Sequence, residues 1–329
     1  MGKYIIKRVL LALLILLGAS IIIYFLVRLM PADYIDQQTS AQRQQGLLTD
    51  ADVQRMKDLY GIGDSSFFGI IGSYVDWLGN LLRGDLGISF VYGRPVQEVI
   101  YKYMWISFAI SAVAMVFQFI IAIPLGIVAA TKQYGPIDYT VTVLAMMGIS
   151  LPSFFFGALL INFFSIKLGW FPLLGLNDDT QMLMGFQRFL DQVHHLVLPM
   201  ITLVVLSIGG LMRYTRTNML EVLNSDYIRT ARAKGLSEHT VIYKHAFRNT
   251  LIPLVTMFAG IIPGLFGGAM ITESVFAIPG IGYTAYKAVL AADIPFVMGY
   301  NMFLAVLTVL GTLISDILYC VVDPRVKLR

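Results

Sequence analysis

Six apolar stretches, each long enough to cross a lipid bilayer as a helix, constrain this chain more than any other feature. A bilayer core about 30 Å thick is spanned by about 20 apolar residues in a helix. Only 13% of the 329 residues are charged, against about 25% in a soluble domain. The sequence therefore predicts an all-α membrane protein with six transmembrane helices, at residues 9–30, 105–130, 139–165, 196–212, 251–272 and 300–322.

The distribution of charge predicts how these helices are oriented. Six spans place both termini on one side of the membrane, together with segments 131–138 and 213–250. This side carries 14 basic and 6 acidic residues, and the opposite side carries 10 basic and 14 acidic. Because basic segments stay in the cytoplasm, we expect a multi-pass protein with both termini cytoplasmic. The first apolar run is too long for a signal-peptide core and no cleavage site follows it, so we expect it to be retained.

A long segment, residues 31–104, follows the first helix and is predicted to lie outside the cytoplasm. Thr49 can cap one short amphipathic helix there, ended by Gly61, and a second helix stops before Gly84. The apolar faces of these two helices consist of Val53, Met56 and Tyr60, and of Tyr74, Trp77 and Leu81. We divide the chain accordingly into the N-terminus with the first span (1–30), the extracytoplasmic segment (31–104) and the core (105–329).

The most informative pattern lies in the predicted cytoplasmic loop 213–250. Ser225 or Asn224 can cap a short helix, Gly235 can end it in a left-handed conformation, and Ser237 can cap a second helix. The first helix mixes small and basic side chains, so its backbone can approach another protein while its cations meet acidic partners. We predict a docking element made of Asp226, Tyr227, Arg229, Thr230, Ala231, Arg232, Ala233, Lys234 and Gly235.

Two other interpretations of this loop were weighed. The Gly-Leu-Ser turn between two helices is also typical of a DNA-binding helix-turn-helix, but such a motif needs a free face to enter the major groove. Membrane spans begin within about 13 residues on either side, which argues against nucleic acid as a partner. The plainer alternative is a basic loop that only obeys the orientation rule.

The loop also carries a family resemblance, in the runs MLEVL (219–223), DYIRTARAKGL (226–236) and HAFRN (245–249). These resemble the cytoplasmic loop of permease subunits in bacterial oligopeptide and dipeptide ABC importers. In the general importer motif, Glu-Ala-Ala-x3-Gly-x9-Ile-x-Leu-Pro, Gly235 is the glycine. Arg229, Thr230 and Ala231 stand at Glu-Ala-Ala, and His245 stands at Ile. These residues differ from the general importer motif but resemble the version found in the peptide importers. They do not identify the substrate, because related branches of the family carry nickel complexes or oligosaccharides.

The resemblance extends over nearly the whole chain. Further matching runs are LRGDLGIS (82–89), PV (95–96), LGWFP (168–172), ESVF (273–276), PGIG (279–282) and DPR (323–325). Each run is weak alone, but their order and spacing together are specific. The long 31–104 segment resembles the first of the two permeases in such systems.

The resemblance implies a bacterial cell-membrane subunit that is not itself an enzyme. It implies as partners a second homologous permease, two cytoplasmic ABC ATPases, an extracytoplasmic substrate-binding protein, a peptide substrate and membrane lipid. ATP and Mg²⁺ would be bound by the ATPases, and no cofactor is expected in this chain. The sequence agrees, because it contains no Gly-x4-Gly-Lys-Ser/Thr phosphate loop.

The translocation pathway is less well marked. The fifth predicted span is rich in glycine and proline, which are tolerated where backbone lines a cavity or packs closely against another helix. Both roles remain open for Gly264, Gly267 and Gly268. Glu273, at the outer end of this span, is a candidate gate or a candidate contact for the binding protein.

Other reactive groups have plain interpretations. His194 and His195 lack accompanying ligands at metal-binding spacing, so we expect no metal site. Cys320 is the only cysteine, which excludes an intramolecular disulfide. No arrangement typical of a catalytic site is present. The intramembrane polar residues are few: Gln118, Asn162, Asn301 and Asp316. Each is a candidate substrate contact, and Asp316, close to the cytoplasmic end, can instead lie at the interface or pair locally.

Two other functional classes were considered. An ion-gradient-driven secondary transporter usually shows internal repeats and intramembrane ionisable residues, and this chain shows neither clearly. A membrane anchor or assembly factor would not require the docking element.

Overall fold

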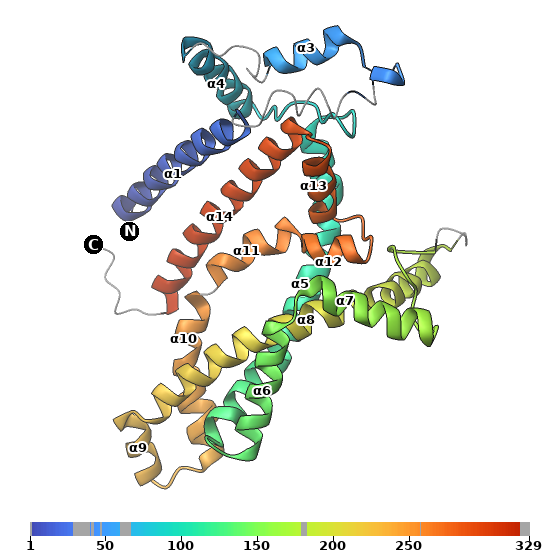
Figure 1. The fold of residues 1–329 in the computed structure, drawn as a ribbon. Helices are drawn as coiled ribbons and strands as arrows, with labels where there is room; N and C mark the ends of the chain where they lie inside the picture. The colour runs from blue at the N-terminus through green and yellow to red at the C-terminus, as the bar shows by residue number, and fades with distance from the viewer. Residues whose placement is uncertain are drawn as a thin grey trace. The chain divides into compact units, whose positions relative to one another are not determined.

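The computed structural model describes residues 2–28, 40, 43–46, 48–59, 67–178, 183–256 and 258–322, and this part of the chain is mainly helical (Figure 1). Its one β pairing is an isolated bridge between Ile88 and Pro95. Of the sequence predictions, those on Tyr60, Gly61 and the 323–325 run fall outside the described residues, as do the side chains of Met56 and Cys320.

The first half of the described chain contains α1 (Gly2–Arg28), α3 (Asp50–Leu59), α4 (Phe67–Leu82), α5 (Val96–Thr131), α6 (Pro136–Ser150), α7 (Ser153–Leu160) and the π-helix η1 (Ile161–Lys167). The second half contains α8 (Gly185–Leu223), α9 (Asp226–Ala233), the π-helix η2 (Thr240–Phe247), α10 (Arg248–Thr256), α11 (Phe258–Gly267), α12 (Met270–Val275), α13 (Ile281–Leu290) and α14 (Ile294–Val322).

Among the described residues, four helices are long and apolar enough to cross a membrane, over Ile6–Leu26, Val96–Thr131, Gly185–Leu223 and Ile294–Asp316. They contain most or all of the first, second, fourth and sixth predicted spans. The remaining two predicted spans are interrupted, so the count of six remains a prediction.

The third predicted span is not a single straight helix. Helix α6 and the α7–η1 helix are bent by 101° at a short break. Leu151, which precedes Pro152, takes an extended conformation (φ −82°, ψ 128°). A proline disfavours the helical conformation of the residue before it, so Pro152 accounts for the complete break between the two helices.

The fifth predicted span is likewise interrupted, at the break between α11 and α12. Pro263 lies inside α11, and Gly268, at φ +75°, lies between α11 and α12. A proline or a left-handed residue interrupts helical hydrogen bonding, so an apolar stretch of sufficient length does not give one continuous helix here.

The fourth predicted span, the shortest from sequence, lies within a 39-residue helix, α8. Helix α8 continues as a polar helix beyond the apolar stretch at both ends, and it extends into the predicted segment 213–250. His194 and His195 also lie on α8. Nδ1 of His195 lies 2.9 Å from the Asp191 carbonyl oxygen, and Nε2 of His194 lies 2.9 Å from that of Trp170. No group of potential metal ligands occurs among the described residues.

The chain forms two compact units, Met1–Trp105 with Thr284–Leu310, and Ile106–Tyr283 with Gly311–Arg329. These units reflect contacts within the chain, whereas the three predicted segments reflect position relative to a membrane, so that division remains a prediction. In the first unit, both short helices predicted between the first two spans are present as α3 and α4. The side-chain oxygen of Thr49 accepts a bond from the N–H of Asp52 at 3.2 Å, as expected of a cap.

The second unit contains a close helix contact between α6 and α8. Ala145 is buried on α6, and Gly209 is buried on α8. A Cβ on Gly209 would overlap the carbonyl oxygen of Ala145. On the other side of the same contact, a Cβ on Gly148 would lie 2.8 Å from the carbonyl oxygen of Val205. The two backbones therefore touch, as small residues allow in membrane helices.

We predict that Gly209→Val destabilises the protein, because the new side chain must push α6 away from α8. Overpacking of this kind costs about 1–3 kcal/mol. Gly210→Val is the matched control, since a Cβ on Gly210 meets no atom within 4 Å. The measurement is the thermal stability of the purified protein in detergent. Equal melting temperatures for the two variants would contradict the close contact.

Candidate functional site

The short helix predicted within the docking element is present as α9, at one end of α8 (Figure 1). Ser225 takes the extended N-cap conformation, but its hydroxyl donates to the Val222 carbonyl at 2.6 Å and its oxygen accepts no N–H group of α9. The predicted cap is therefore supplied by backbone geometry alone. Gly235 has φ +73°, which confirms the predicted left-handed position. Ser237 caps the following helix as predicted, accepting a bond from the Thr240 N–H at 3.4 Å.

One face of α9 packs against its own chain. Ile228 is fully buried and Ala231 is 7% exposed. They belong to a hydrophobic cluster that α5, α8 and η2 complete with Ile127, Ala130, Met219, Val241 and Ala246. The side chain of Ala231, predicted from sequence to face a partner, thus lies inside the chain's own packing.

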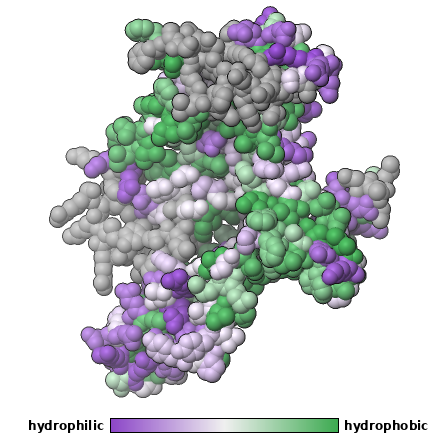
Figure 2. All heavy atoms as spheres, viewed as in Figure 1, coloured by the Kyte–Doolittle hydropathy of each residue, from purple (hydrophilic) through white to green (hydrophobic). Residues whose placement is uncertain are grey.

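The opposite face of α9 is open. Tyr227 is 48% exposed. Thr230 lies three residues after Tyr227, Lys234 lies four residues after Thr230, and both are exposed. Such residues share one face of a helix. Arg229 and Ala233 are exposed beside them, and the pair between Arg229 and Asp226 is a surface contact of 3.6 Å. Figure 2 shows this end of the second unit as a hydrophilic surface, in contrast to the hydrophobic surface over α7.

An ion pair fixes the turn after α9. Nη2 and Nε of Arg232 donate to the two carboxylate oxygens of Glu238 at 2.7 and 3.2 Å. These hydrogen bonds lower the pKa of Glu238 and raise that of Arg232. Arg232, one of the predicted docking cations, is therefore engaged within the loop, while Arg229 and Lys234 remain on its surface.

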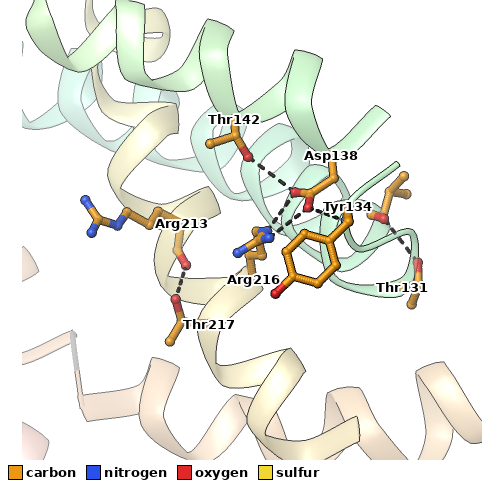
Figure 3. Close-up of polar contacts among 8 residues, drawn as sticks. Thr131, Tyr134, Asp138, Thr142, Arg213, Arg216 and Thr217 are labelled. Atoms are coloured by element: carbon orange, nitrogen blue, oxygen red, sulfur yellow. Dashed lines mark hydrogen bonds and ion pairs between the residues drawn. The ribbon is translucent and has the colours of Figure 1, made fainter. Parts of the chain in front are cut away.

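A second ion pair joins α6 to α8, in the same unit (Figure 3). Nε and Nη2 of Arg216 donate to the two oxygens of Asp138 at 2.7 and 2.8 Å. Asp138 is 3% exposed. It also accepts the Tyr134 N–H at 3.0 Å and the Thr142 hydroxyl at 3.3 Å. The predicted loop 131–138 is thereby tied to the helix that leads into α9.

Of the predicted pathway residues, Gly264 lines a cleft of about 450 Å³ between α5, α8 and α11. The polar side chains of this cleft are uncharged: Ser111, Gln118 and Ser207. Gln118 donates to the Ser207 carbonyl at 3.0 Å, which joins α5 to α8. Apolar side chains, among them Met115, Phe119 and Leu265, form the rest of the wall.

Glu273 is not a surface group. It is 1% exposed, and its carboxylate accepts the Ser107 hydroxyl at 2.7 Å and the N–H groups of Ala269 and Tyr283 at 3.0 and 2.9 Å. The Ser107 oxygen in turn accepts the Ile281 N–H at 2.8 Å. Glu273 therefore orders the turns on both sides of α12, including the turn at Gly268, directly after Gly267 at the end of α11, and offers no oxygen to a partner at the surface.

The structure adds residues that sequence reasoning missed. In the first unit, the fully buried Asp293 accepts the Ser89 hydroxyl at 2.5 Å and the N–H groups of Phe90 and Val91, each at 3.0 Å. This contact gives Ser89, the last residue of the LRGDLGIS run, a structural role. The only available signal was a lone acidic residue before an apolar helix, typical of a helix cap.

Comparisons with known proteins agree with the resemblance seen in the sequence. Residues 122–328 match the family described as the binding-protein-dependent transport system inner membrane component. The oligopeptide transport system permease protein AppB of Bacillus subtilis is 38% identical over 99% of this chain and 100% of its own. The dipeptide transport system permease protein DppB of Alkalihalophilus pseudofirmus is 33% identical over 99% and 100%.

A solved structure shares the fold. A chain of the MetNI methionine ABC transporter, in an inward-facing conformation, superimposes with a TM-score of 0.52. It is 18% identical and covers 69% of this chain and 97% of its own.

We predict that Asp138→Asn destabilises the protein, because Arg216 loses a charged partner at a nearly closed site. Hydrogen bonds to charged groups contribute about 1.5–3 kcal/mol. Asp226→Asn is the control, since its side chain is 98% exposed and exposed pairs contribute little. The measurement is thermal stability at neutral pH. An unchanged melting temperature for Asp138→Asn would exclude a structural role for the pair.

Proposed function

The chain belongs to the family of binding-protein-dependent transport system inner membrane components, and from this membership we propose that it forms half of the peptide pathway of an ATP-driven importer. A second, homologous permease forms the other half, two cytoplasmic ABC ATPases supply the energy, and an extracytoplasmic binding protein delivers the peptide. The names of the two similar permeases, which state oligopeptide and dipeptide transport, support this substrate class.

The observation that carries the proposal is the two-sided construction of α9. Its inner face is fixed by Ile228 and Ala231, and its outer face presents Tyr227, Thr230 and Lys234. A helix built in this way is suited to transmit force, because a partner that moves it must also move the elements beneath it. We place the ATPase against this outer face.

Coupling requires that the ATPase contact α9 differently in its nucleotide-bound and nucleotide-free states. A partner that binds both arrangements equally well shifts no equilibrium. A rigid turn, formed by Gly235 and the Arg232–Glu238 ion pair, keeps α9 in one orientation while the ATPases close. The movement that the ATPases impose on α9 is therefore passed on to the membrane helices.

The cleft beside Gly264 fits a peptide whose side chains vary. Neutral hydroxyl and amide groups can bond to the backbone of any peptide, and the apolar wall accepts different side chains without a charge preference. We therefore assign this cleft to the pathway.

Uptake should require ATP hydrolysis rather than an ion gradient. The test is peptide uptake by vesicles that contain the reconstituted complex. Uptake that continues without hydrolysis and follows a proton or sodium gradient would contradict the proposal.

We predict that Gly235→Val uncouples ATP hydrolysis from peptide uptake, because a β-branched residue is strongly disfavoured at φ +73°. Nothing lies within 4 Å of the added Cβ, so the effect is conformational rather than steric. Gly235→Asn is the matched variant, since asparagine tolerates this conformation better. We expect uptake to fall at least severalfold in the valine variant only. Normal coupling in both variants would remove the turn from the mechanism.

We also predict that Tyr227→Glu weakens association with the ATPases, since it places a carboxylate in the centre of the proposed contact. Tyr286→Glu, at a tyrosine 41% exposed on α13, is the control. The measurement is the amount of ATPase that co-purifies with each variant. Equal recovery would show that the ATPase binds elsewhere. Ala231→Asp is not used, because it would disturb the internal packing directly.

A further inference from the structure

A second cavity, separate from the pathway cleft, lies between α6 and α8. It has a volume of about 400 Å³ and includes two arginines, Arg213 and Arg216, on one turn of α8. The remaining lining residues are Thr142, Ala145, Met146, Gly209, Met212 and Thr217. The cavity is therefore cationic at one end and apolar at the other.

The charge of this cavity is not balanced within the described part of the chain. Asp138 is already engaged with two nitrogens of Arg216, which leaves Nη1 of Arg216 without a bond to that carboxylate. Arg213 is exposed and makes no ion pair with a described residue, and it points away from Asp138 (Figure 3). The hydroxyls of Thr142 and Thr217 donate to Asp138 and to the Arg213 carbonyl, so they are not the groups that would donate to a ligand. The groups that would donate to a ligand are the guanidinium groups of Arg213 and Arg216.

The apolar end of the cavity continues onto an exposed face of α6. Met146 lines the cavity and is 44% exposed, and the neighbouring Val143 and Met147 are 56% and 58% exposed. A free anion would use only the arginines. The combined surface instead matches a molecule with an anionic head and apolar tails.

We propose that this cavity binds the phosphate headgroup of an anionic phospholipid, with Arg213 as its principal ligand. Arg216 provides a second cation from its position against Asp138, and the acyl chains lie along Val143, Met146 and Met147. Arginine suits this role because its fork of N–H groups can bond two phosphate oxygens at once. Basic pockets between membrane helices bind anionic headgroups in this way.

The position of the site gives the bound lipid a structural consequence. Arg213 and Arg216 lie on α8 between the α6 contact at Gly209 and the loop that carries α9. A headgroup bound there contacts both helices and favours their packed arrangement. Anionic lipid should therefore stabilise the protein in proportion to its binding.

The test uses the full-length chain, purified with its co-purifying subunits and delipidated in detergent. Phosphatidylglycerol, phosphatidylcholine and inorganic phosphate are added separately, and bound lipid is counted by native mass spectrometry while thermal stability is followed. We expect the protein to retain phosphatidylglycerol in preference to phosphatidylcholine. Arg213→Gln should weaken this binding about tenfold or more, the effect of losing a charged hydrogen-bonding group.

Arg188→Gln is the matched control, since Arg188 is exposed near the other end of the same helix. Arg213→Lys should retain part of the binding. The lipid-free melting temperature of Arg213→Gln should equal that of the wild type, which separates a binding defect from a folding defect.

Three results would overturn the proposal. Equal phosphatidylglycerol binding by wild type and Arg213→Gln would exclude this site. Displacement of the lipid by millimolar inorganic phosphate, with the same stabilisation, would assign the cavity to a free anion. Loss of a co-purifying subunit from Arg213→Gln without a change in lipid count would assign it to a protein partner.

Discussion

The burial of Ile228 and Ala231 against the chain's own helices is the interaction on which the functional interpretation depends. Without it, α9 would be a short basic helix of eight residues, and helices of that length are marginally stable in water. The cluster formed with α5, α8 and η2 gives α9 a fixed orientation and decides which of its residues face outward. The small residues of the motif then have two different roles. Ala231 permits close packing inside the chain. Thr230 and Ala233 have small side chains, so a partner can approach the backbone of the outer face closely.

Two ion pairs extend this rigidity in different ways. Arg232 and Glu238 fix the turn that follows α9, at the surface, where the pair contributes more to geometry than to stability. Asp138 and Arg216 join α6 to α8 nearer the interior, where an uncompensated charge would be costly. Because Arg216 is occupied by Asp138, the neighbouring Arg213 supplies the positive charge of the α6–α8 cavity. One acidic residue thus determines which of two arginines is structural and which is available to a ligand.

Local patterns in the sequence predicted local structure well and distant contacts poorly. Thr49, Gly235 and the apolar face of α4 follow from capping and helical periodicity, which involve residues close in sequence. The apolar stretches located the membrane helices but not their ends, since α8 continues as a polar helix and Pro152 breaks the third span. The partners of Glu273 and Asp293 could not be predicted. Ser107 and Ser89 lie 166 and 204 residues away, and no periodicity connects them.

Helix α8 provides a physical connection between the proposed docking face of α9 and the proposed pathway cleft. Ser207 and Gly210 line the pathway cleft, and the same helix continues without interruption to Leu223, directly before α9. The distance from Ser207 to the end of the helix is about 24 Å at 1.5 Å per residue. The helix-interior proline, Pro199, lies before the cleft residues, so no proline bend separates them from α9. A displacement of α9 by a partner must therefore move one wall of the cleft. Helix α8 is attached to α6 through the contact at Gly209 and through Asp138. These contacts determine how far α6 moves together with α8.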